Sequence, residues 1–331
     1  MRIQLKLKFP LVVIAWLFAG LISSGQAKDM QHDPRSFEWK PELSPQGAVT
    51  IVVSLSRQEA LVYRNGVRIG RCLVSTGKKG YETPTGIFHI LNKDKDHRSK
   101  TYNNAPMPYS ERLTWDGVAL HAGGLPGYPE SHGCIHLPYE FSKLLFGVTQ
   151  KGVTVVVTKD YAEAYVTNNH GAPVSGHRPN QFQNNVSWMW TPEKSPSGPV
   201  SVLVSETDKK IYVLRNGVPI GESPIAVTRS GRKFSGTQAF SLLNRGNGAV
   251  HSPDGKLSAK WMRIGGTQGM HAEPLTDFFH IPPGFARELD TLLHPGSIVV
   301  VTSEAVTKQS KSNPGFTILA SQALRKADGK Q

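Results

Sequence analysis

The sequence has few cysteines, and it lacks the motifs of several large functional classes. Only 2 of its 331 residues are cysteine, which excludes a disulfide-rich scaffold. Hydrophobic residues make up 38%, enough for real cores and too few for a multi-span membrane protein. No nucleotide-binding loop, common zinc spacing or nucleic-acid module is recognisable. We therefore expect no cofactor, no metal and no nucleic-acid partner.

The first 27 residues have the pattern of a signal peptide. Arg2, Lys6 and Lys8 form a basic region, an apolar run follows at residues 9–22, and Gly25-x-Ala27 matches a cleavage site. An uncleaved anchor is the alternative, although the run is short for a membrane span, which needs roughly 20 residues. Either way we expect an exported chain that meets the membrane only through this segment.

Basic residues outnumber acidic ones, and the formal net charge is +13. Without the three basic residues of the signal segment, 35 basic and 25 acidic residues remain, a net charge of +10. Such a charge suits contact with an anionic polymer or membrane surface, and ordinary solubility explains it equally well.

From residue 48 onward, strand patterns dominate. Strands are predicted at residues 49–55, 60–64, 68–75, 87–91, 115–121 and 152–158, with one short helix at 138–146 and a charged loop at 93–100. Asn65-Gly66 lies between two apolar runs, which is a strong hairpin signal. Residues 28–47 are an irregular lead-in, and the proline-rich residues 160–197 are a linker or a wrapped segment. The sequence predicts a mainly β domain at residues 48–159.

The same pattern returns later in the chain, with an offset of 151 residues in the two matches nearest the N-terminus. Residues 213–221 echo residues 62–70, and residues 296–302 echo residues 152–158. Three further matches follow in the same order, including Met270-His271-Ala272 against Leu120-His121-Ala122. We therefore predict two copies of one domain, the second at residues 198–303, with a basic tail at 304–331. The second copy has no cysteine.

Ser131-His132-Gly133-Cys134 is the stretch best suited to catalysis. A cysteine nucleophile needs a base for its proton, and both His121 and His132 are candidates. The Ala122 carbonyl or another loop carbonyl could orient His121, and the amides of residues 132–134 could hold an oxyanion. Cys72 lies in a strand-like run, so we expect it in the core and Cys134 free. A disulfide between them is the alternative.

A zinc site is a second possibility at this stretch. His132, Cys134 and His136 alternate, so on a strand they would face one side, with His121 nearby. Gly133 disfavours a regular strand at this point.

These residues carry a resemblance to the L,D-transpeptidase (YkuD-type) family. Ser131-His132-Gly133-Cys134 after His121 resembles its catalytic signature, and Thr83-Pro84-Thr85-Gly86-Ile87-Phe88 resembles its Thr-Pro-x-Gly-x-Phe segment. The resemblance implies a β-sandwich-like domain with one or two short helices in each copy. It also implies a periplasmic enzyme of peptidoglycan biosynthesis, cell-wall organisation and cell shape. Its partners would be tetrapeptide stems and an amine acceptor: diaminopimelate, a lipoprotein lysine or a D-amino acid.

The resemblance also implies a role for each site residue. Cys134 would be the nucleophile and His121 the general base, with His132 and Gly133 in the oxyanion loop and Ser131 orienting that loop. Substrate contacts would come from Ala122, Gly123, Tyr128 and His136. The family commonly has Arg or Asn where this chain has His136, which suggests altered specificity.

Three further possibilities remain from the sequence. Water as the acceptor would make the enzyme an L,D-carboxypeptidase or an amidase. A non-catalytic cell-wall-binding module is the rival from another class. The second copy, degenerate because it lacks the cysteine, would bind glycan or stem peptide, cover the first as a lid, or only stabilise it.

Overall fold

A computed structural model describes residues 33, 35–159, 164–166, 174, 186–227, 237–245, 259–264, 278–303 and 305–306. The predicted signal segment, His271 and nearly all of the predicted tail lie outside these residues. Within them, no helix is long and apolar enough to cross a membrane. The chain is mainly β, as predicted, and its strands form several sheets.

The first unit, residues 35–159, contains two sheets and one α-helix. Its six-stranded sheet has the order β1-β4-β3-β2-β10-β5, and its four-stranded sheet has the order β6-β7-β8-β9. The elements are β1 (Phe37–Trp39), η1 (Pro41–Leu43), β2 (Val49–Ser54), β3 (Glu59–Arg64), β4 (Val67–Leu73), β5 (Gly86–His89), β6 (Asn92–Asp94), β7 (Ser110–Arg112), β8 (Ala119–Ala122), β9 (Ile135–Leu137), α1 (Tyr139–Val148) and β10 (Thr154–Thr158).

Local sequence explains the β3–β4 hairpin. Asn65 and Gly66 both have positive φ angles, 49° and 79°, as a two-residue turn between twisted strands requires. The predicted turn is confirmed. Along β2, Ile51 and Val53 point into the core beneath α1, whereas Val52 points to the opposite face. All six residues of β2 are buried because both faces of the sheet are covered.

Several short strands depart from the sequence prediction. The strand expected at residues 115–121 is confined to β8, and the charged loop expected at 93–100 begins with β6. The irregular lead-in contains β1, which pairs with β4, and the predicted linker contains β12 (Met189–Trp190), which pairs with β15. These strands have two to four residues, too few for an alternating pattern to be visible.

The second unit, residues 186–303 together with the strand Ala164–Val166, has a sheet with a related strand order. Its eight strands follow β11-β18-β17-β20-β13-β14-β15-β12, and β12-β15-β14-β13-β20-β17 parallels the six-stranded sheet of the first unit. A separate pair joins β16 and β19. The elements are β11 (Ala164–Val166), β12, η3 (Pro192–Lys194), β13 (Val200–Ser205), β14 (Lys210–Arg215), β15 (Val218–Pro224), β16 (Ala226–Val227), β17 (Thr237–Arg245), β18 (Ala259–Ile264), β19 (Phe279–His280), α2 (Pro283–Leu292) and β20 (Ile298–Thr302).

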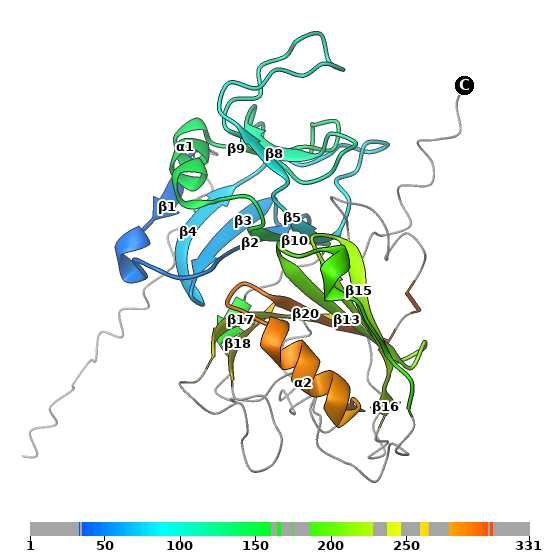
Figure 1. Cartoon of the computed structure of the whole chain (residues 1–331). Helices are drawn as coiled ribbons and strands as arrows, with labels where there is room; N and C mark the ends of the chain where they lie inside the picture. The colour runs from blue at the N-terminus through cyan, green and yellow to red at the C-terminus, as the bar shows by residue number, and fades with distance from the viewer. Residues whose placement is uncertain are drawn as a thin grey trace, which may run out of the picture.

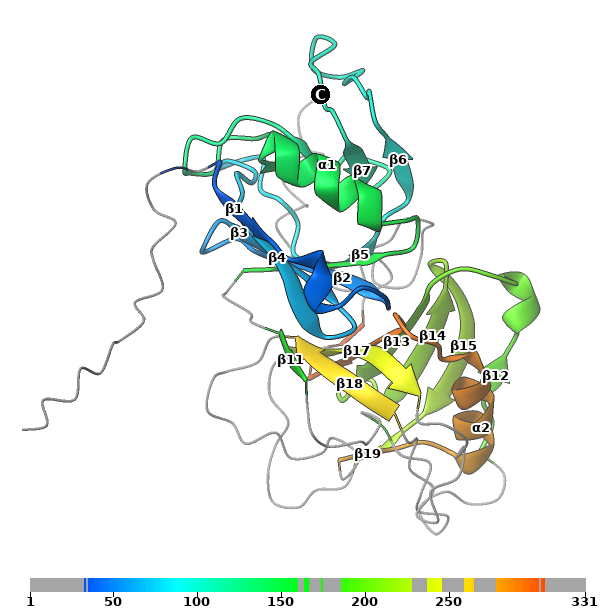
Figure 2. The same cartoon turned by 90° about the vertical axis from the view of Figure 1, so that its left-hand side faces the viewer.

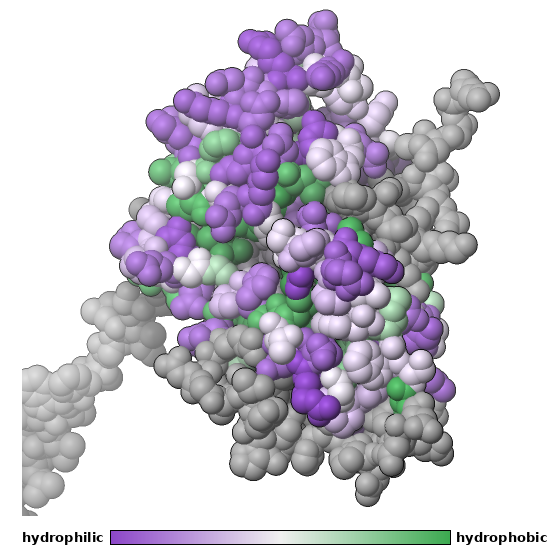
Figure 3. All heavy atoms as spheres, in the orientation of Figure 1, coloured by the Kyte–Doolittle hydropathy of each residue, from purple (hydrophilic) through white to green (hydrophobic). Residues whose placement is uncertain are grey.

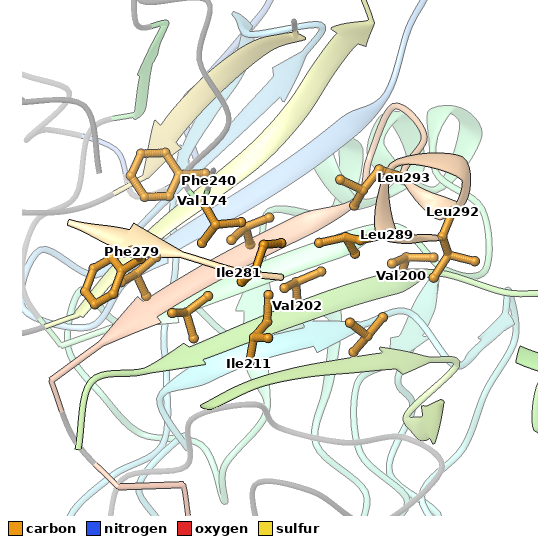
Figure 4. Packing of buried hydrophobic residues seen from close by; sticks show 14 of the residues in the cluster. Val174, Val200, Val202, Ile211, Phe240, Phe279, Ile281, Leu289, Leu292 and Leu293 are labelled. Atoms are coloured by element: carbon orange, nitrogen blue, oxygen red, sulfur yellow. The ribbon is translucent and has the colours of Figure 1, made fainter. Parts of the chain in front are cut away.

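The core of each unit lies between a sheet and a helix. Figure 4 shows Leu289, Leu292 and Leu293, from α2 and its C-terminal end, with residues of β13 such as Val200. Trp190 contacts Phe285 edge-on at 5.3 Å, and Trp39 contacts Phe141 in the same way at 5.3 Å in the first unit. The two cores therefore share a detail of packing as well as a strand order.

The two units pack through the sheet faces that point away from their helices. Figures 1 and 2 show the six-stranded sheet of the first unit lying over the sheet of the second. The apolar contact comprises Val52, Leu61, Tyr63, Ile87 and Val156 from the first unit and Leu203, Tyr212, Leu214, Ala239, Leu243, Met262, Ile264, Ile298 and Val300 from the second.

Among the residues that the structure describes, Thr50 and His89 make buried side-chain hydrogen bonds that cross this contact. Thr50 Oγ1 lies 3.3 Å from Ser241 Oγ, and His89 Nε2 lies 2.9 Å from Ser201 Oγ. In the sequence repeat Thr50 corresponds to Ser201 and His89 to Ser241. Each bond therefore joins the same two positions of the repeat, taken from opposite units. This is the relation found at a two-fold interface between like subunits.

Candidate active site

Cys134 lies at the end of a tight loop, directly before β9. Its thiol is partly exposed, and its Sγ atom is 3.5 Å from the carbonyl oxygen of Gly117. Burial raises the thiol pKa, while the Ala119 amide and the charge of Arg112 act against that shift. The thiol therefore rests protonated at neutral pH and needs a base to become a nucleophile.

His121 is held in one orientation by β8. Its Nδ1 atom lies 2.8 Å from the Ala122 carbonyl oxygen, one of the alternatives that the sequence offered. Because a carbonyl only accepts, Nδ1 carries the proton and Nε2 keeps a free lone pair. Burial is the main cause that lowers the pKa of His121 to about 4, and the neighbouring His136 adds to it. His121 is thus neutral at pH 7 and able to accept a proton.

The loop from Ser131 to Cys134 is closed by the Ser131 hydroxyl. Ser131 Oγ accepts from the Gly133 amide at 3.1 Å and donates to the Cys134 carbonyl at 2.6 Å. Gly133 has a φ of 106°, which side chains rarely tolerate. A Cβ there would meet no protein atom closer than 3.7 Å, so the backbone conformation, not close packing, requires glycine.

This loop changes the predicted oxyanion donors. The sequence suggested the amides of residues 132–134, but the Gly133 amide already donates to Ser131. Within the part of the chain that the structure describes, the amides of His132 and Cys134 have no acceptor. The two free amides are therefore the candidates for stabilising a negative oxygen.

The His132 side chain lies between two tyrosines. Its ring centroid is 4.6 Å from that of Tyr81 and 4.8 Å from that of Tyr102. Both tyrosines are about half exposed, at 50% and 45%. His132, which is also exposed, forms an aromatic rim with them beside the thiol.

His136 lies beside His121 because β8 and β9 pair in parallel with these two residues in register. Their ring centroids are 4.7 Å apart, and His136 Nδ1 is 3.1 Å from the Gly124 carbonyl oxygen. A Cβ on Gly123 would lie 2.6 Å from the His136 ring. The ring can therefore occupy its observed position only because residue 123 is a glycine. Burial lowers the pKa of His136, with Gly124 and Glu130 acting in the opposite direction.

A pocket of about 1070 Å³ joins these groups. Five predicted residues besides Cys134 line it: His121, Gly123, Ser131, His132 and His136. Three others do not line it: Ala122, Gly133 and Tyr128. Ala122 and Gly133 are buried and act through their backbones. The Tyr128 side chain is 59% exposed, and its carbonyl accepts from Ser75 Oγ.

Sequence reasoning missed many of the lining residues, among them Arg112, Trp115 and Tyr102. Arg112 is on β7, a strand that was not predicted, and it is the cation that acts on the thiol pKa. No motif marked these positions, since loop and strand pairing bring them to the pocket. The surface above β8 and β9 in Figure 3 is mostly hydrophilic.

The geometry does not support the zinc alternative at this stretch. Strand β9 begins at Ile135, so His132, Cys134 and His136 do not share one strand face. Among the described residues, no group of three His, Cys, Asp or Glu side chains is placed to hold a metal ion. Both cysteines are free, as predicted, and Cys72 is fully buried in the core.

Comparison with known proteins finds a family model that matches part of the chain, within the first unit. Residues 48–157 match the family model YkuD, described as the L,D-transpeptidase catalytic domain. L,D-transpeptidase 1 of Mycobacterium tuberculosis, in strains H37Rv and CDC 1551, is 30% identical over 122 residues, which are 32% of this chain and 49% of the relative. The chain spans about half the length of the curated relatives it matches.

Solved structures show the same partial coverage. An L,D-transpeptidase from Stackebrandtia nassauensis is 33% identical over 35% of this chain and 57% of its own, with a TM-score of 0.32. An L,D-transpeptidase from Mycobacterium tuberculosis H37Rv is 26% identical over 34% and 58%, with a TM-score of 0.33.

Proposed function

We propose that this chain is an L,D-transpeptidase that acts on peptidoglycan stem peptides through an acyl-enzyme on Cys134. The observation that carries the proposal is the pocket in which the thiol, the neutral His121 and two free loop amides meet within a matched YkuD domain. A nucleophile, a base and oxyanion donors are the parts that acyl transfer requires.

In the first step, Sγ of Cys134 attacks the carbonyl carbon that precedes the terminal D-residue of a tetrapeptide stem. The thiol proton passes to Nε2 of His121, and the carbonyl oxygen becomes an oxyanion facing the amides of His132 and Cys134. When the tetrahedral intermediate collapses, His121 returns the proton to the leaving amine. D-alanine departs, and a thioester remains on Cys134.

In the second step, an amine attacks the thioester carbonyl and gives its proton to Nε2 of His121. The C–S bond then breaks, and His121 returns the proton to the departing sulfur, so the Cys134 thiol is restored. Diaminopimelate as the acceptor makes a 3–3 cross-link, a lipoprotein lysine anchors a protein, and a D-amino acid exchanges the terminus. Water as the acceptor is the alternative activity, L,D-carboxypeptidase or amidase. The partial exposure of Cys134 leaves the thioester accessible to either class of acceptor.

We assign the second unit a stabilising role as a degenerate copy of the first. The β19–α2 stretch corresponds to β9–α1, and this alignment puts Phe278 where the first unit has Cys134. Among the described residues, the second unit contributes none to the pocket. It packs on the sheet face remote from α1 (Figure 1), which disfavours a lid.

The proposed function places the protein outside the cytoplasm. A periplasmic enzyme of cell-wall organisation fits the predicted signal segment and the basic charge of the chain. Its partners are peptidoglycan stems and an acceptor amine, and it uses no cofactor.

The test is intact mass after mixing the mature protein with a carbapenem, a mimic of the acyl donor. We expect one adduct on the wild type and none on Cys134→Ala, because the only other thiol, Cys72, is buried. Burial also raises the pKa of Cys72, which makes it a built-in unreactive control. A folded wild type with a free thiol and no adduct would overturn the proposal and favour the binding-module alternative.

A further inference from the structure

We propose that Thr83 is a positioning residue for the oxyanion site: its hydroxyl sets the plane of the Gly133–Cys134 peptide. The inference deepens the proposed function and rests on it. Thr83 is 3% exposed and does not line the pocket, so it acts through the loop and not on the substrate.

The Thr83 hydroxyl makes two hydrogen bonds to two different backbone segments. It accepts from the Gly77 amide at 2.8 Å and donates to the Gly133 carbonyl at 2.9 Å. The hydroxyl thus serves as an acceptor in one bond and as a donor in the other. Thr83 thus connects the segment after β4 with the loop that carries Cys134.

The first of these segments is itself rigidly placed. Residues 75–78 lie along the motif loop, with backbone bonds from Lys78 N to Ser131 O and from Ser131 N to Thr76 O, both of 3.0 Å. A Cβ on Gly77 would be 1.9 Å from the Tyr81 carbonyl oxygen, so the chain is closely packed there. The Thr83 hydroxyl, which binds Gly133, is therefore itself bound to a segment whose backbone position is fixed by hydrogen bonds and close packing.

The bond to Gly133 determines where the Cys134 amide points. A trans peptide is planar, and its C=O and N–H point in opposite directions. Since the Gly133 carbonyl points to the buried Thr83, the N–H of Cys134 points away from it. That amide is one of the two that have no acceptor among the described residues.

Without the hydroxyl, this peptide has little else to hold it. Gly133 is at a φ of 106°, and glycine has wide access to other conformations. The Ser131 bonds hold the Gly133 amide and the Cys134 carbonyl, which belong to the flanking peptides. The Gly133–Cys134 peptide would be free to rotate, and its buried carbonyl would be left unpaired.

The experiment compares carbapenem acylation of the full mature chain with that of Thr83→Val, Thr83→Ser and Thr83→Cys. Thr83→Val keeps the shape and removes the hydroxyl, so we expect the acylation rate constant to fall about 100-fold, as for a displaced catalytic group. The constant for initial non-covalent binding should stay unchanged. Thr83→Ser should restore the rate to within about three-fold, and Thr83→Cys, a weaker donor, should fall between them.

The matched control is Thr76→Val. Thr76 is also buried, at 2% exposed, and its hydroxyl accepts from Gln58 Nε2 at 2.7 Å, away from the Gly133 carbonyl. We expect it to lower the unfolding temperature as Thr83→Val does while leaving the acylation rate within about two-fold.

Equal slowing in Thr76→Val and Thr83→Val would overturn the inference, and so would an unchanged rate in Thr83→Val. If Thr83→Val does not fold, a Thr83→Cys rate equal to wild type would overturn it in the same way. The proposed function fails separately, because in that case the wild type itself forms no adduct.

Discussion

At the scale of single residues, the Cys134 thiol and the His121 imidazole both rest uncharged at neutral pH. Burial raises the pKa of Cys134 and lowers the pKa of His121 to about 4, because a buried site disfavours either charge. The site therefore holds no preformed ion pair. In the reaction that we propose, proton transfer to His121 would accompany the attack of the sulfur. The Ala122 carbonyl, 2.8 Å from Nδ1, leaves Nε2 as the atom that accepts the proton.

This arrangement predicts the pH dependence of acylation. His121 is protonated only as the pH falls through about 4, so the carbapenem acylation rate should be flat from pH 7 to about 5 and decline below that. An unperturbed histidine would already give a decline near pH 6.5. Stopped-flow measurement of adduct formation tests this, with circular dichroism at each pH as the control for folding. A midpoint near 6.5 would contradict the prediction.

At the scale of elements, the parallel pair β8–β9 builds the site. The register that sets His121 opposite His136 follows from three paired positions, ending at Ala122 and Leu137. Gly123 then continues from β8, with its amide bonded to the Leu137 carbonyl at 3.2 Å. The His136 ring occupies the space that a Cβ on Gly123 would take.

Gly123→Ala should therefore displace His136 and change the titration of His121. Moving the His136 ring away exposes His121 and removes a neighbour that lowers its pKa, so that pKa should rise from about 4 toward its ordinary 6.5. The acid limb of the acylation profile should move to higher pH by about one unit or more, with a rate loss at neutral pH of about 10-fold.

Gly147→Ala is the control for that variant. Gly147 lies on α1, and a Cβ there would meet no atom within 4 Å. Its profile should match the wild type. An unshifted acid limb in Gly123→Ala would show that His136 does not influence His121.

At the scale of the whole molecule, two β units cover each other's outer sheet faces. The two related hydrogen bonds, Thr50 with Ser241 and His89 with Ser201, lie within an apolar contact between the units. Burial lowers the pKa of His89 to about 4. Because this folded-state pKa is below the unfolded value of 6.5, stability from this group is lost as pH falls from 6.5 toward 4.

An isolated first unit, residues 28–165, should self-associate. It would expose the apolar face that holds Val52, Leu61 and Tyr63. In the full chain this face packs against the similar face of the second unit, so two copies of the first unit could pack in the same way. Sedimentation velocity should show a dimer, and Leu61→Glu should make the unit monomeric. A wild-type unit that stays monomeric would contradict this interpretation of the face.

The same fragment tests the stabilising role of the second unit. Full activity of residues 28–165 on intact sacculi would remove any required substrate role for the second unit. A large loss of activity in a folded fragment would instead favour glycan or stem-peptide binding by that unit.

The sequence by itself determined the features that depend on neighbouring residues. Asn65-Gly66 specifies its turn through the φ angles that these two residues tolerate. The β-branched run Ile51-Val52-Val53 predicts a strand. In the motif from Ser131 to Cys134, the first residue closes the loop by a hydrogen bond to the carbonyl of the last. The order of the repeated patterns also predicted that similar strand sets would appear twice.

Only the tertiary structure decided which groups meet across the chain. The Gly133 amide is occupied, Arg112 and Trp115 reach the pocket, and Thr83 holds the motif loop from 50 residues away. A β-branched run predicts a strand, but it does not show what covers each face of that strand. Pairing between distant segments decides what covers each face. The local sequence pattern of one segment does not show which distant segment it will contact.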